Sequence, residues 1–350
     1  MERRVLGRSG VHVGVIGLGA MMFGPGGNAD EDECVGMIHR ALDAGVNLID
    51  TADGYTRGHS ERIVGRALQG PRRDDVVIAT KCYFPRGADP NRRGGSRRWI
   101  LRACEESLRR LGTDRIDLYQ LHRLDPRVDL EESLGALDDL VRAGKVISTG
   151  TSGVSAHDLV TCQWTATDRG FVRPVSEQSP YSVFVRAAER ALFPACLRHG
   201  VGVLVYGPLN GGWLTGKYRA DQPPPEGSRA AQRFYDSGWW DRQRPEVQRK
   251  LALVDELDKL ARDCGLRLAD LALAFTLAHP AVTCALVGPR TPEQLESALA
   301  AADIRLDDAV LDRIDELVEP GLDIDPTDLV VVDDALDVVN RRRPSPRAVN

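Results

Sequence analysis

The chain has 350 residues, of which 42% are hydrophobic, with a formal net charge of −5 and a sequence pI of about 5.9. Such a chain can bury a large core, and an α/β barrel of this length folds as one unit. No basic excess supports a nucleic-acid or anionic membrane partner. Seven scattered cysteines without metal-ligand spacing favour free thiols in a reducing compartment, a cytoplasmic location and no metal site.

Short aliphatic runs alternate with longer amphipathic segments, a pattern typical of βα units around a parallel sheet. The N-terminal stretch RRVLGRSGVHV predicts a hairpin of two short strands, and the apolar run after it lacks the cleavage site of a signal peptide. Strands are expected at 14–18, 46–50, 76–80, 116–121, 146–150, 173–178, 201–206 and 282–287. Helices are expected at 32–44, 60–69, 97–111, 130–143, 155–169, 187–199, 268–278 and 292–302.

Eight strand and helix pairs predict a (β/α)₈ TIM barrel, with a doubly wound sheet as the main alternative. We expect one barrel domain over residues 1–320, with a long mouth loop over 206–245 after the seventh strand, and a tail over 321–350. The Pro-, Gly- and Trp-rich loop fits either a lid or a tolerated insertion. The middle of the tail predicts a short helix or strand packed on the barrel, and its Arg- and Pro-rich end predicts a loose terminus.

Polar residues follow consecutive strands at the end of a barrel where chemistry takes place. Asp50 ends the second predicted strand, with Tyr55 five residues later, Lys81 follows the third strand and His122 follows the fourth. Each residue alone is more often structural, but together they predict an acid-base group. A lysine ammonium favours the phenolate and lowers the pKa of a tyrosine. Asp50 would hold Lys81 in place, and His122 would orient a carbonyl for protonation.

Several motifs resemble the aldo-keto reductase superfamily, in order and at its spacing, over about residues 3–318. They are DTADGYTRGHSERIVGRAL, IATK, RIDLYQLHRLDP, LDDLVRAGKV, VYGPLNGGWLTGKY and GPRTPEQLESALAA. The resemblance implies an NADP(H)-dependent reductase of aldehydes and ketones on a TIM barrel. It assigns Tyr55 as the general acid, Lys81 and Asp50 as the residues that tune it, and His122 as the residue that positions the carbonyl.

The resemblance also implies a cofactor site. Gln178 would bind the nicotinamide amide and Tyr206 would stack on the ring, while the family's Ser-Asn pair is Ser152-Gly153 here, with one amide contact fewer. Further contacts are expected from Gly19, Ala20, Met21, Gly207, Pro208, Leu209, Gly211, Lys217, Gly288, Arg290 and Gln294.

The cofactor preference rests on the C-terminal part of this set. Arg290, with Gly288, would hold the adenosine 2′-phosphate, because a guanidinium is a planar and always charged partner, and this favours NADP(H) over NAD(H). The family's usual Asn near the adenine corresponds to Ala298, which leaves the preference less firmly supported. The glycine-rich GLGAMMFG lacks the third glycine of a GxGxxG fingerprint, so a Rossmann interpretation is weak.

Met21, Tyr83, Phe84 and Trp213 are predicted to line a pocket for a small carbonyl substrate, although such side chains near strand ends also pack in cores. A generic aldehyde reductase is the first hypothesis, and a reductase of a keto-sugar or a nucleotide-linked deoxysugar is its alternative. Two other classes stay open. One is a Schiff-base enzyme that uses Lys81 as nucleophile, and the other is a non-catalytic NADPH-sensing subunit. The oligomeric state cannot be read from the sequence.

Overall fold

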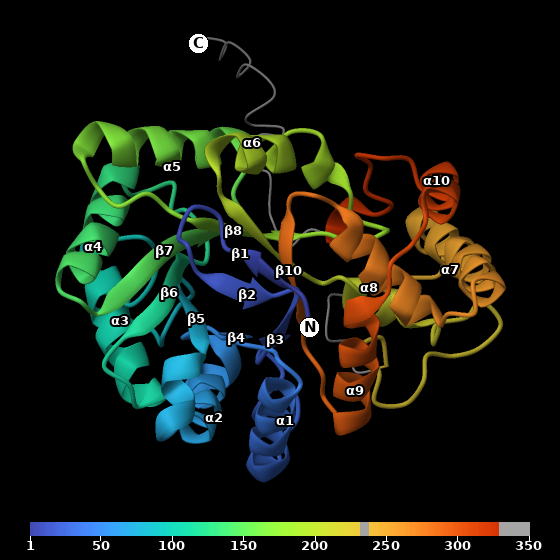
Figure 1. Ribbon diagram of the computed structural model, residues 1–350, viewed down its shortest axis with the longest axis horizontal. Coiled ribbons are helices and arrows are strands. Elements are labelled where there is room, and N and C mark those ends of the chain that lie inside the picture. The colour runs from blue at the N-terminus through green and yellow to red at the C-terminus, as the bar shows by residue number, and fades with distance from the viewer. Residues whose placement is uncertain (232–237, 329–350) are drawn as a thin grey trace, which may run out of the picture.

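A closed barrel of eight parallel strands forms the centre of the computed structural model, which describes residues 1–231 and 238–328 (Figure 1). Around the barrel the strands follow the order β10-β3-β4-β5-β6-β7-β8-β9, so each strand pairs with its neighbour in sequence and β10 closes the ring on β3. Their bounds are β3 Ile16–Gly19, β4 Leu48–Asp50, β5 Val77–Cys82, β6 Ile116–Leu121, β7 Val146–Ser152, β8 Ser176–Pro180, β9 Gly202–Tyr206 and β10 Val282–Val287. The predicted TIM barrel is confirmed.

Helices surround the barrel (Figure 1). They are α1 Glu31–Asp43, α2 His59–Ala67, α3 Arg97–Leu111, α4 Leu130–Arg142, α5 Ala156–Arg169, α6 Leu192–His199, α7 Pro245–Asp263, α8 Leu268–Ala278, α9 Pro292–Ala300 and α10 Asp308–Leu317. Side-chain caps begin several of them, as at Ser96 before α3 and Thr291 before α9, where the hydroxyl accepts a hydrogen bond from a backbone N–H of the first turn.

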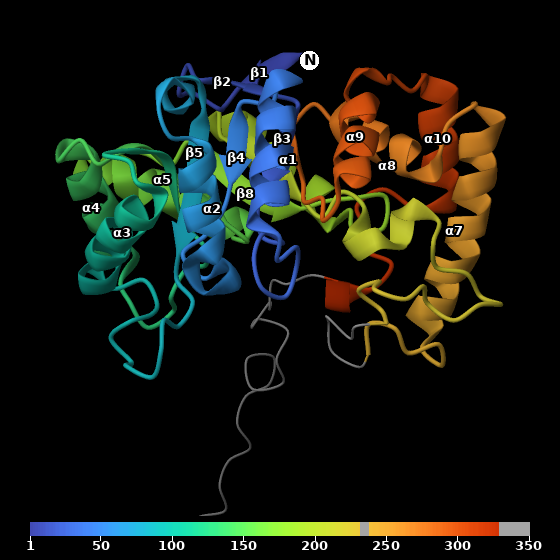
Figure 2. The same ribbon diagram turned by 90° about the horizontal axis from the view of Figure 1, so that it is seen from below.

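The predicted N-terminal hairpin is confirmed, and it closes the end of the barrel opposite the C-terminal ends of the strands (Figure 2). Its strands, β1 Arg3–Val5 and β2 His12–Gly14, pair antiparallel. Leu6 and Val13 from the hairpin pack against Leu48 and other inward-facing strand residues. This apolar plug fills the base of the barrel, so the space for a ligand lies at the C-terminal ends of the strands.

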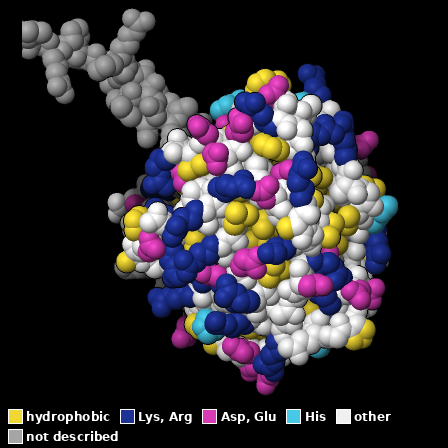
Figure 3. All heavy atoms as spheres, turned by 90° about the vertical axis from the view of Figure 1, so that its left-hand side faces the viewer, with side chains coloured by type: hydrophobic (Ala, Val, Ile, Leu, Met, Phe, Trp, Pro, Cys, Tyr) yellow, Lys and Arg dark blue, Asp and Glu magenta, His cyan; other side chains and the backbone are white. Residues whose placement is uncertain are grey.

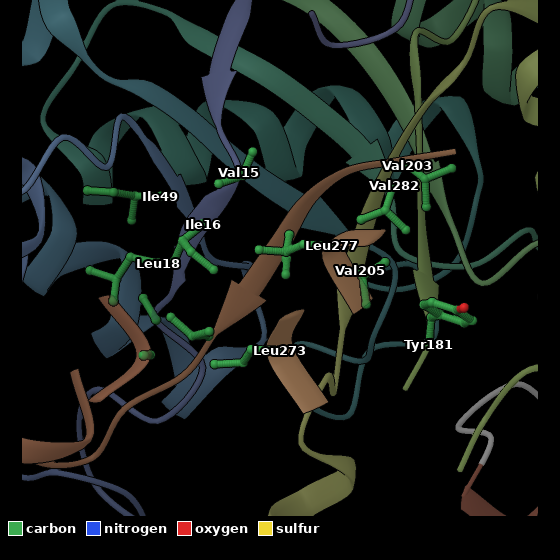
Figure 4. Packing of buried hydrophobic residues seen from close by; sticks show 14 of the residues in the cluster. Val15, Ile16, Leu18, Ile49, Tyr181, Val203, Val205, Leu273, Leu277 and Val282 are labelled. Atoms are coloured by element: carbon green, nitrogen blue, oxygen red, sulfur yellow. The ribbon is translucent and has the colours of Figure 1, made fainter. Parts of the chain in front are cut away.

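A second apolar layer fills the space between the strands and the surrounding helices (Figure 4). Ile16 and Leu18 from β3 and Val282 from β10 lie in this layer with Leu273 and Leu277 of α8. Each fully buried aliphatic side chain of this kind contributes about 2 kcal/mol through its removal from water. The layer therefore holds the strand ends, and the polar side chains on them, in fixed positions.

The structure corrects several predicted elements. It adds α7 and α10, and it starts α6 at Leu192 after a separate 3₁₀ turn, Ala187–Glu189, rather than at residue 187. The strand expected at 173–178 lies at Ser176–Pro180. Because β5 runs to Cys82, Lys81 lies within a strand and points into the barrel instead of following it.

The described part of the tail, residues 321–328, continues across the mouth. Asp323 forms an isolated bridge with Val185, and the N–H of Ile324 donates to the carbonyl of Phe184. The helix or strand expected in the middle of the tail, and its expected loose end, fall on residues 329–350, outside the described residues.

Basic and acidic side chains are interspersed on the face over α3, α4 and α5 (Figure 3). All seven cysteines are free thiols, and only Cys264 is exposed. Within the described residues, each helix is too short or too polar to cross a membrane.

Candidate active site

Lys81 contacts two of the other predicted catalytic residues, Asp50 and Tyr55, at the barrel mouth. Its Nζ donates to Oδ1 of Asp50 at 2.5 Å and to the carbonyl of Thr51 at 2.9 Å. The same ammonium lies 3.3 Å from the hydroxyl oxygen of Tyr55, and it lies 4.9 Å from the centre of that ring. Lys81 is fully buried, so its charge depends on these partners.

The turn after β4 brings Tyr55 back over the mouth. Thr56 and Arg57 have φ values of 44° and 59°, which are uncommon for residues with a side chain, and Gly58 follows at 90°. Side chains hold this strained turn in place. The hydroxyl of Thr56 donates to the carbonyl of Phe23 and accepts from the N–H of Ser60, each at 2.9 Å.

Burial raises the pKa of Tyr55, and this effect outweighs the lowering by the nearby Lys81 ammonium. The expected net lowering of the tyrosine pKa is therefore wrong, because desolvation penalises the phenolate more than the cation stabilises it. For Lys81, burial lowers the pKa, but the Asp50 carboxylate and Tyr55 raise it above its ordinary value. At neutral pH the site holds a protonated phenol beside a charged ammonium.

His122 follows β6, and its ring stands edge-on to Tyr55, with the ring centres 5.7 Å apart. Burial, the Lys81 ammonium and the Arg123 guanidinium hold the pKa of His122 well below its ordinary value, so the imidazole is neutral at physiological pH. The Phe84 ring centre lies 4.6 Å from that of His122, and the Tyr83 ring centre lies 5.5 Å from that of Phe84. One predicted pocket residue thus contacts His122, and a second contacts the first.

The second carboxylate oxygen of Asp50 is also held. Gln178 of β8 donates its Nε2 to Asp50 Oδ2 at 2.8 Å, and Gln120 of β6 donates at 3.4 Å. Gln120 was not predicted, because a polar residue inside an apolar strand has no local signal of its own. Only its spacing from His122, two residues along an alternating strand, places both side chains on the inner face of the barrel.

Arg123 is a second residue that the sequence analysis missed. Its guanidinium donates to the carbonyl of His122 at 2.6 Å and lies 3.5 Å from Ser152 Oγ. Burial raises the pKa of Tyr206 to about 12, against the lowering effect of Arg123. Arg123 therefore brings a positive charge between the ends of β6, β7 and β9.

The residues predicted to bind the nicotinamide lie at neighbouring strand ends. Gly19 ends β3, with Ala20 and Met21 directly after it, and the N–H of Ala20 donates to the carbonyl of Asp50 at 2.8 Å. Ser152 and Gln178 are register partners on β7 and β8. Tyr206 ends β9, which pairs with β8, so Ser152, Gln178 and Tyr206 lie on three consecutive strands of the barrel.

The residues predicted to bind the phosphates include a group of cations. Burial and the positive charges of Arg290 and Arg229 lower the pKa of Lys217 to about 8. The N–H of Arg290 donates to Gln294 Oε1 at 2.9 Å, which joins the end of β10 to α9. Neighbouring cations repel one another, and a bound polyanion would stabilise them. Arg229 was not predicted, because its loop carries no periodic pattern.

Glycines shape the loop between Tyr206 and Lys217. Gly207, Gly211 and Gly212 have φ values of 68°, 65° and 102°. Pro208 and Leu209 lie between them, followed by a 3₁₀ turn at Asn210–Thr215. At the neighbouring strand ends, a Cβ added to Gly288 would lie 3.5 Å from the carbonyl oxygen of Gly19. Turn conformations point successive backbone N–H groups to one side, which is a geometry that suits anions.

Trp213 packs in an aromatic cluster after β9. It is fully buried, with its ring centre 5.2 Å from Tyr218 and 4.9 Å from Trp240. Met21 is half-buried and follows β3. The place of Trp213 and Met21 in a substrate pocket stays a prediction.

Known proteins resemble this chain over nearly its whole length. The family model described as "Aldo/keto reductase family" matches residues 15–319. An oxidoreductase of Bacillus subtilis, YrpG, is 37% identical over 332 residues, covering 92% of this chain and 97% of that protein. A protein of Schizosaccharomyces pombe named as a voltage-gated potassium channel subunit beta is 35% identical, with 90% and 92% covered. Versiconal hemiacetal acetate reductase of Aspergillus parasiticus is 33% identical, with 91% and 98% covered.

The match spans the strands that carry Asp50, Lys81 and His122 as well as the loops that carry the cation group. The closed parallel barrel, which has a buried lysine at its mouth, agrees with the family match over nearly the whole chain. This chain belongs to the aldo/keto reductase family.

Proposed function

We propose that this oxidoreductase reduces the carbonyl group of a small aldehyde or ketone with NADPH. The observation that carries the proposal is the position of Lys81 Nζ, 2.5 Å from Asp50 Oδ1 and 3.3 Å from the Tyr55 hydroxyl. This contact gives a half-buried phenol a fixed cation beside the oxygen that would lose its proton. It is the arrangement that proton transfer from tyrosine requires.

NADPH, when bound, supplies the hydride to the carbonyl carbon. Tyr55 stays protonated at neutral pH, so it can donate its proton to the carbonyl oxygen, and the Lys81 ammonium then stabilises the tyrosinate. Asp50 keeps Lys81 charged and aimed at the phenol. The neutral imidazole of His122 would orient the carbonyl oxygen by a hydrogen bond, beside the apolar ring of Phe84.

The cofactor proposal rests on the strand ends and on the cation group. Lys217, Arg229 and Arg290 would hold phosphate groups of NADPH, and a bound anion would offset the burial and the neighbouring positive charges that lower the pKa of Lys217. Gln178 donates its Nε2 to Asp50, so its Oε1 can accept from the nicotinamide amide. Ser152 would contact the amide and Tyr206 the ring. We also propose a cytoplasmic location, which the free thiols support.

The charged state of Lys81 argues against the Schiff-base alternative. A lysine nucleophile must be neutral, whereas the Asp50 carboxylate raises the pKa of Lys81 above its ordinary value, against the lowering by burial. A keto-sugar or nucleotide-linked deoxysugar substrate is a second candidate within the reductase proposal. A non-catalytic NADPH sensor is the other candidate, and the relative named as a channel subunit supports its inclusion.

One experiment separates these candidates. NADPH oxidation is measured with the purified chain against aldehydes, ketones and keto-sugars, and NADPH binding is measured by titration. Turnover with at least one carbonyl class supports the reductase and names its substrate class. Tight NADPH binding without turnover on the whole panel supports the sensor, and trapping of Lys81 by borohydride with a carbonyl compound supports the Schiff-base enzyme.

A further inference from the structure

A buried ion cluster lies beside the mouth, away from the Asp50–Lys81 pair. Lys250 of α7 is fully buried, and its Nζ lies 2.6 Å from Asp328 Oδ2 and 3.4 Å from Asp325 Oδ2. Arg244 donates to the other oxygen of Asp325 at 2.9 Å. The side chains of Lys250 and Asp325 have no exposed surface. Buried charges of this kind are stable only while their partners are present.

The cluster reaches the loop that is proposed to bind the dinucleotide, residues 207–216, which we call the dinucleotide loop. Asn210 of this loop donates its Nδ2 to Asp328 Oδ2 at 3.1 Å, the same oxygen that pairs with Lys250. Lys250 Nζ also lies 5.3 Å from the ring centre of Trp213, which belongs to the loop. One buried cation thus contacts the loop directly and through Asp328.

The backbone of the dinucleotide loop needs such an anchor. Asn210 has a φ of 46°, a left-handed conformation that is uncommon for a residue with a side chain, and Gly211 and Gly212 follow with φ values of 65° and 102°. Two glycines in succession leave this stretch with many alternative backbone conformations. The side-chain bond from Asn210 to Asp328 selects one of them.

The acidic residues of the cluster belong to residues 321–328, which we call the strap. Its other end is also tied, because Asp323 Oδ1 accepts from the N–H groups of Arg186 and Ala187 at 2.7 and 2.9 Å. The strap therefore joins the loop after β8 to α7 and to the dinucleotide loop. It lies at the mouth end of the barrel, opposite the hairpin (Figure 2).

We propose that Lys250, Asp325 and Asp328 are positioning residues that fix the dinucleotide loop in its cofactor-binding conformation and so slow the release of NADPH. This inference rests on the proposed function. A loop that is ordered before binding loses less conformational entropy when the ligand arrives, and the bound ligand is released more slowly. The strap is thus part of the cofactor site although none of its residues need touch the cofactor.

The test measures the NADPH dissociation rate by stopped-flow displacement in Asn210→Gly, Asp328→Asn and Lys250→Met. Asn210→Gly removes the side-chain bond to Asp328 and adds a third flexible residue to the loop, while it permits the positive φ and leaves the Lys250, Asp325 and Asp328 side chains in place. Lys259→Met is the matched control, because Lys259 lies on the same helix with its side chain exposed. We expect release to accelerate about tenfold in the three variants, as for the loss of one charge-assisted hydrogen bond, and to stay unchanged in the control.

Two further readouts separate positioning from a structural role. The KM for the carbonyl substrate should stay unchanged while the KM for NADPH rises, and the amides of residues 211–215 should exchange hydrogen faster. The double variant Lys250→Met/Asp328→Asn should release NADPH no faster than the faster single variant, because both changes break the same contact.

The outcomes are distinct. If Lys250→Met and Asp328→Asn unfold at lower temperature but release NADPH at the wild-type rate, the cluster serves stability alone. If Asn210→Gly also releases NADPH at the wild-type rate, the inference is overturned. Failure of the wild-type chain to bind NADPH overturns the proposed function, and the positioning role with it. Normal binding with unchanged release in all three variants overturns the inference alone.

Discussion

The ammonium of Lys81 lies between the carboxylate of Asp50 and the hydroxyl of Tyr55. Asp50 and Tyr55 are five positions apart in the chain, and Lys81 lies more than twenty positions beyond them. Asp50 is the last residue of β4, and Tyr55 begins a 3₁₀ turn in which the next two residues, Thr56 and Arg57, are left-handed. Lys81 comes from the neighbouring strand β5, two residues beyond Ala79, which is the register partner of Asp50. The proposed chemistry depends on this convergence, because the cation must serve both the carboxylate and the phenol.

Tyr55→Phe removes the proposed proton donor and keeps the ring. We expect kcat to fall by about two to four orders of magnitude, which is the usual contribution of a general acid, while the Kd for NADPH stays unchanged. The two quantities are measured by steady-state oxidation of NADPH and by fluorescence titration. Tyr119→Phe is a matched control, because the Tyr119 hydroxyl faces Ile100 of α3 outside the barrel. Near wild-type turnover in Tyr55→Phe would falsify the proton-donor role.

Asp50→Asn leaves the buried Lys81 ammonium without its counter-charge. We expect a loss of about 3–5 kcal/mol in the free energy of unfolding, as for other buried pairs that lose one partner, together with a loss of turnover because the pKa of Lys81 falls. Urea unfolding and NADPH oxidation measure the two effects. Glu296→Gln breaks the exposed pair with Arg40 and should leave both quantities unchanged. Equal stability of Asp50→Asn and wild type would contradict the role of this pair.

Much of this arrangement could be predicted from the sequence, because a period of two and the ends of apolar runs identify inward-facing positions such as Asp50 and Lys81. Gln120 could not be predicted as a site residue, because a polar residue inside an apolar strand has no local signal of its own. Arg229 could not be predicted either, because its loop has no periodicity from which its neighbours could be inferred. Trp213 shows a third limit, since a large aromatic side chain near a strand end fits a core as well as a pocket.

The stability of the chain should depend on pH through Asp53, two residues before Tyr55. The Asp53 carboxyl is 1% exposed, and its pKa is raised to about 7 by burial and by Glu61, while Arg86, Arg110 and the N–H of Gly54 oppose the shift. Because the folded pKa lies above the unfolded value of about 3.9, the protonated form is favoured in the fold. The contribution of the protonated Asp53 carboxyl to the free energy of unfolding is complete below pH about 4, and it is lost as the pH rises through 7.

Asp53→Asn removes this titration and keeps the shape of the side chain. We expect the variant to be less sensitive to pH between 5 and 8, and to be more stable than wild type at pH 8 by at most about 4 kcal/mol, the linkage bound for a shift of about three units. Urea unfolding at several pH values measures the difference. Parallel pH profiles for the two proteins would show that Asp53 does not titrate in this range.

Arg290→Ala tests the proposed cofactor preference. The guanidinium lies with Lys217 and Arg229 in the cation group, and its removal leaves a 2′-phosphate without a planar charged partner. We expect the Kd for NADPH to rise about 10- to 100-fold, as for the loss of a charge-assisted contact, while the Kd for NADH changes little. Arg198→Ala, at an exposed position on α6, is the control. Equal losses for the two cofactors would assign Arg290 to a part of the dinucleotide that they share, such as the pyrophosphate, and the preference for NADPH would then need another residue of the same group.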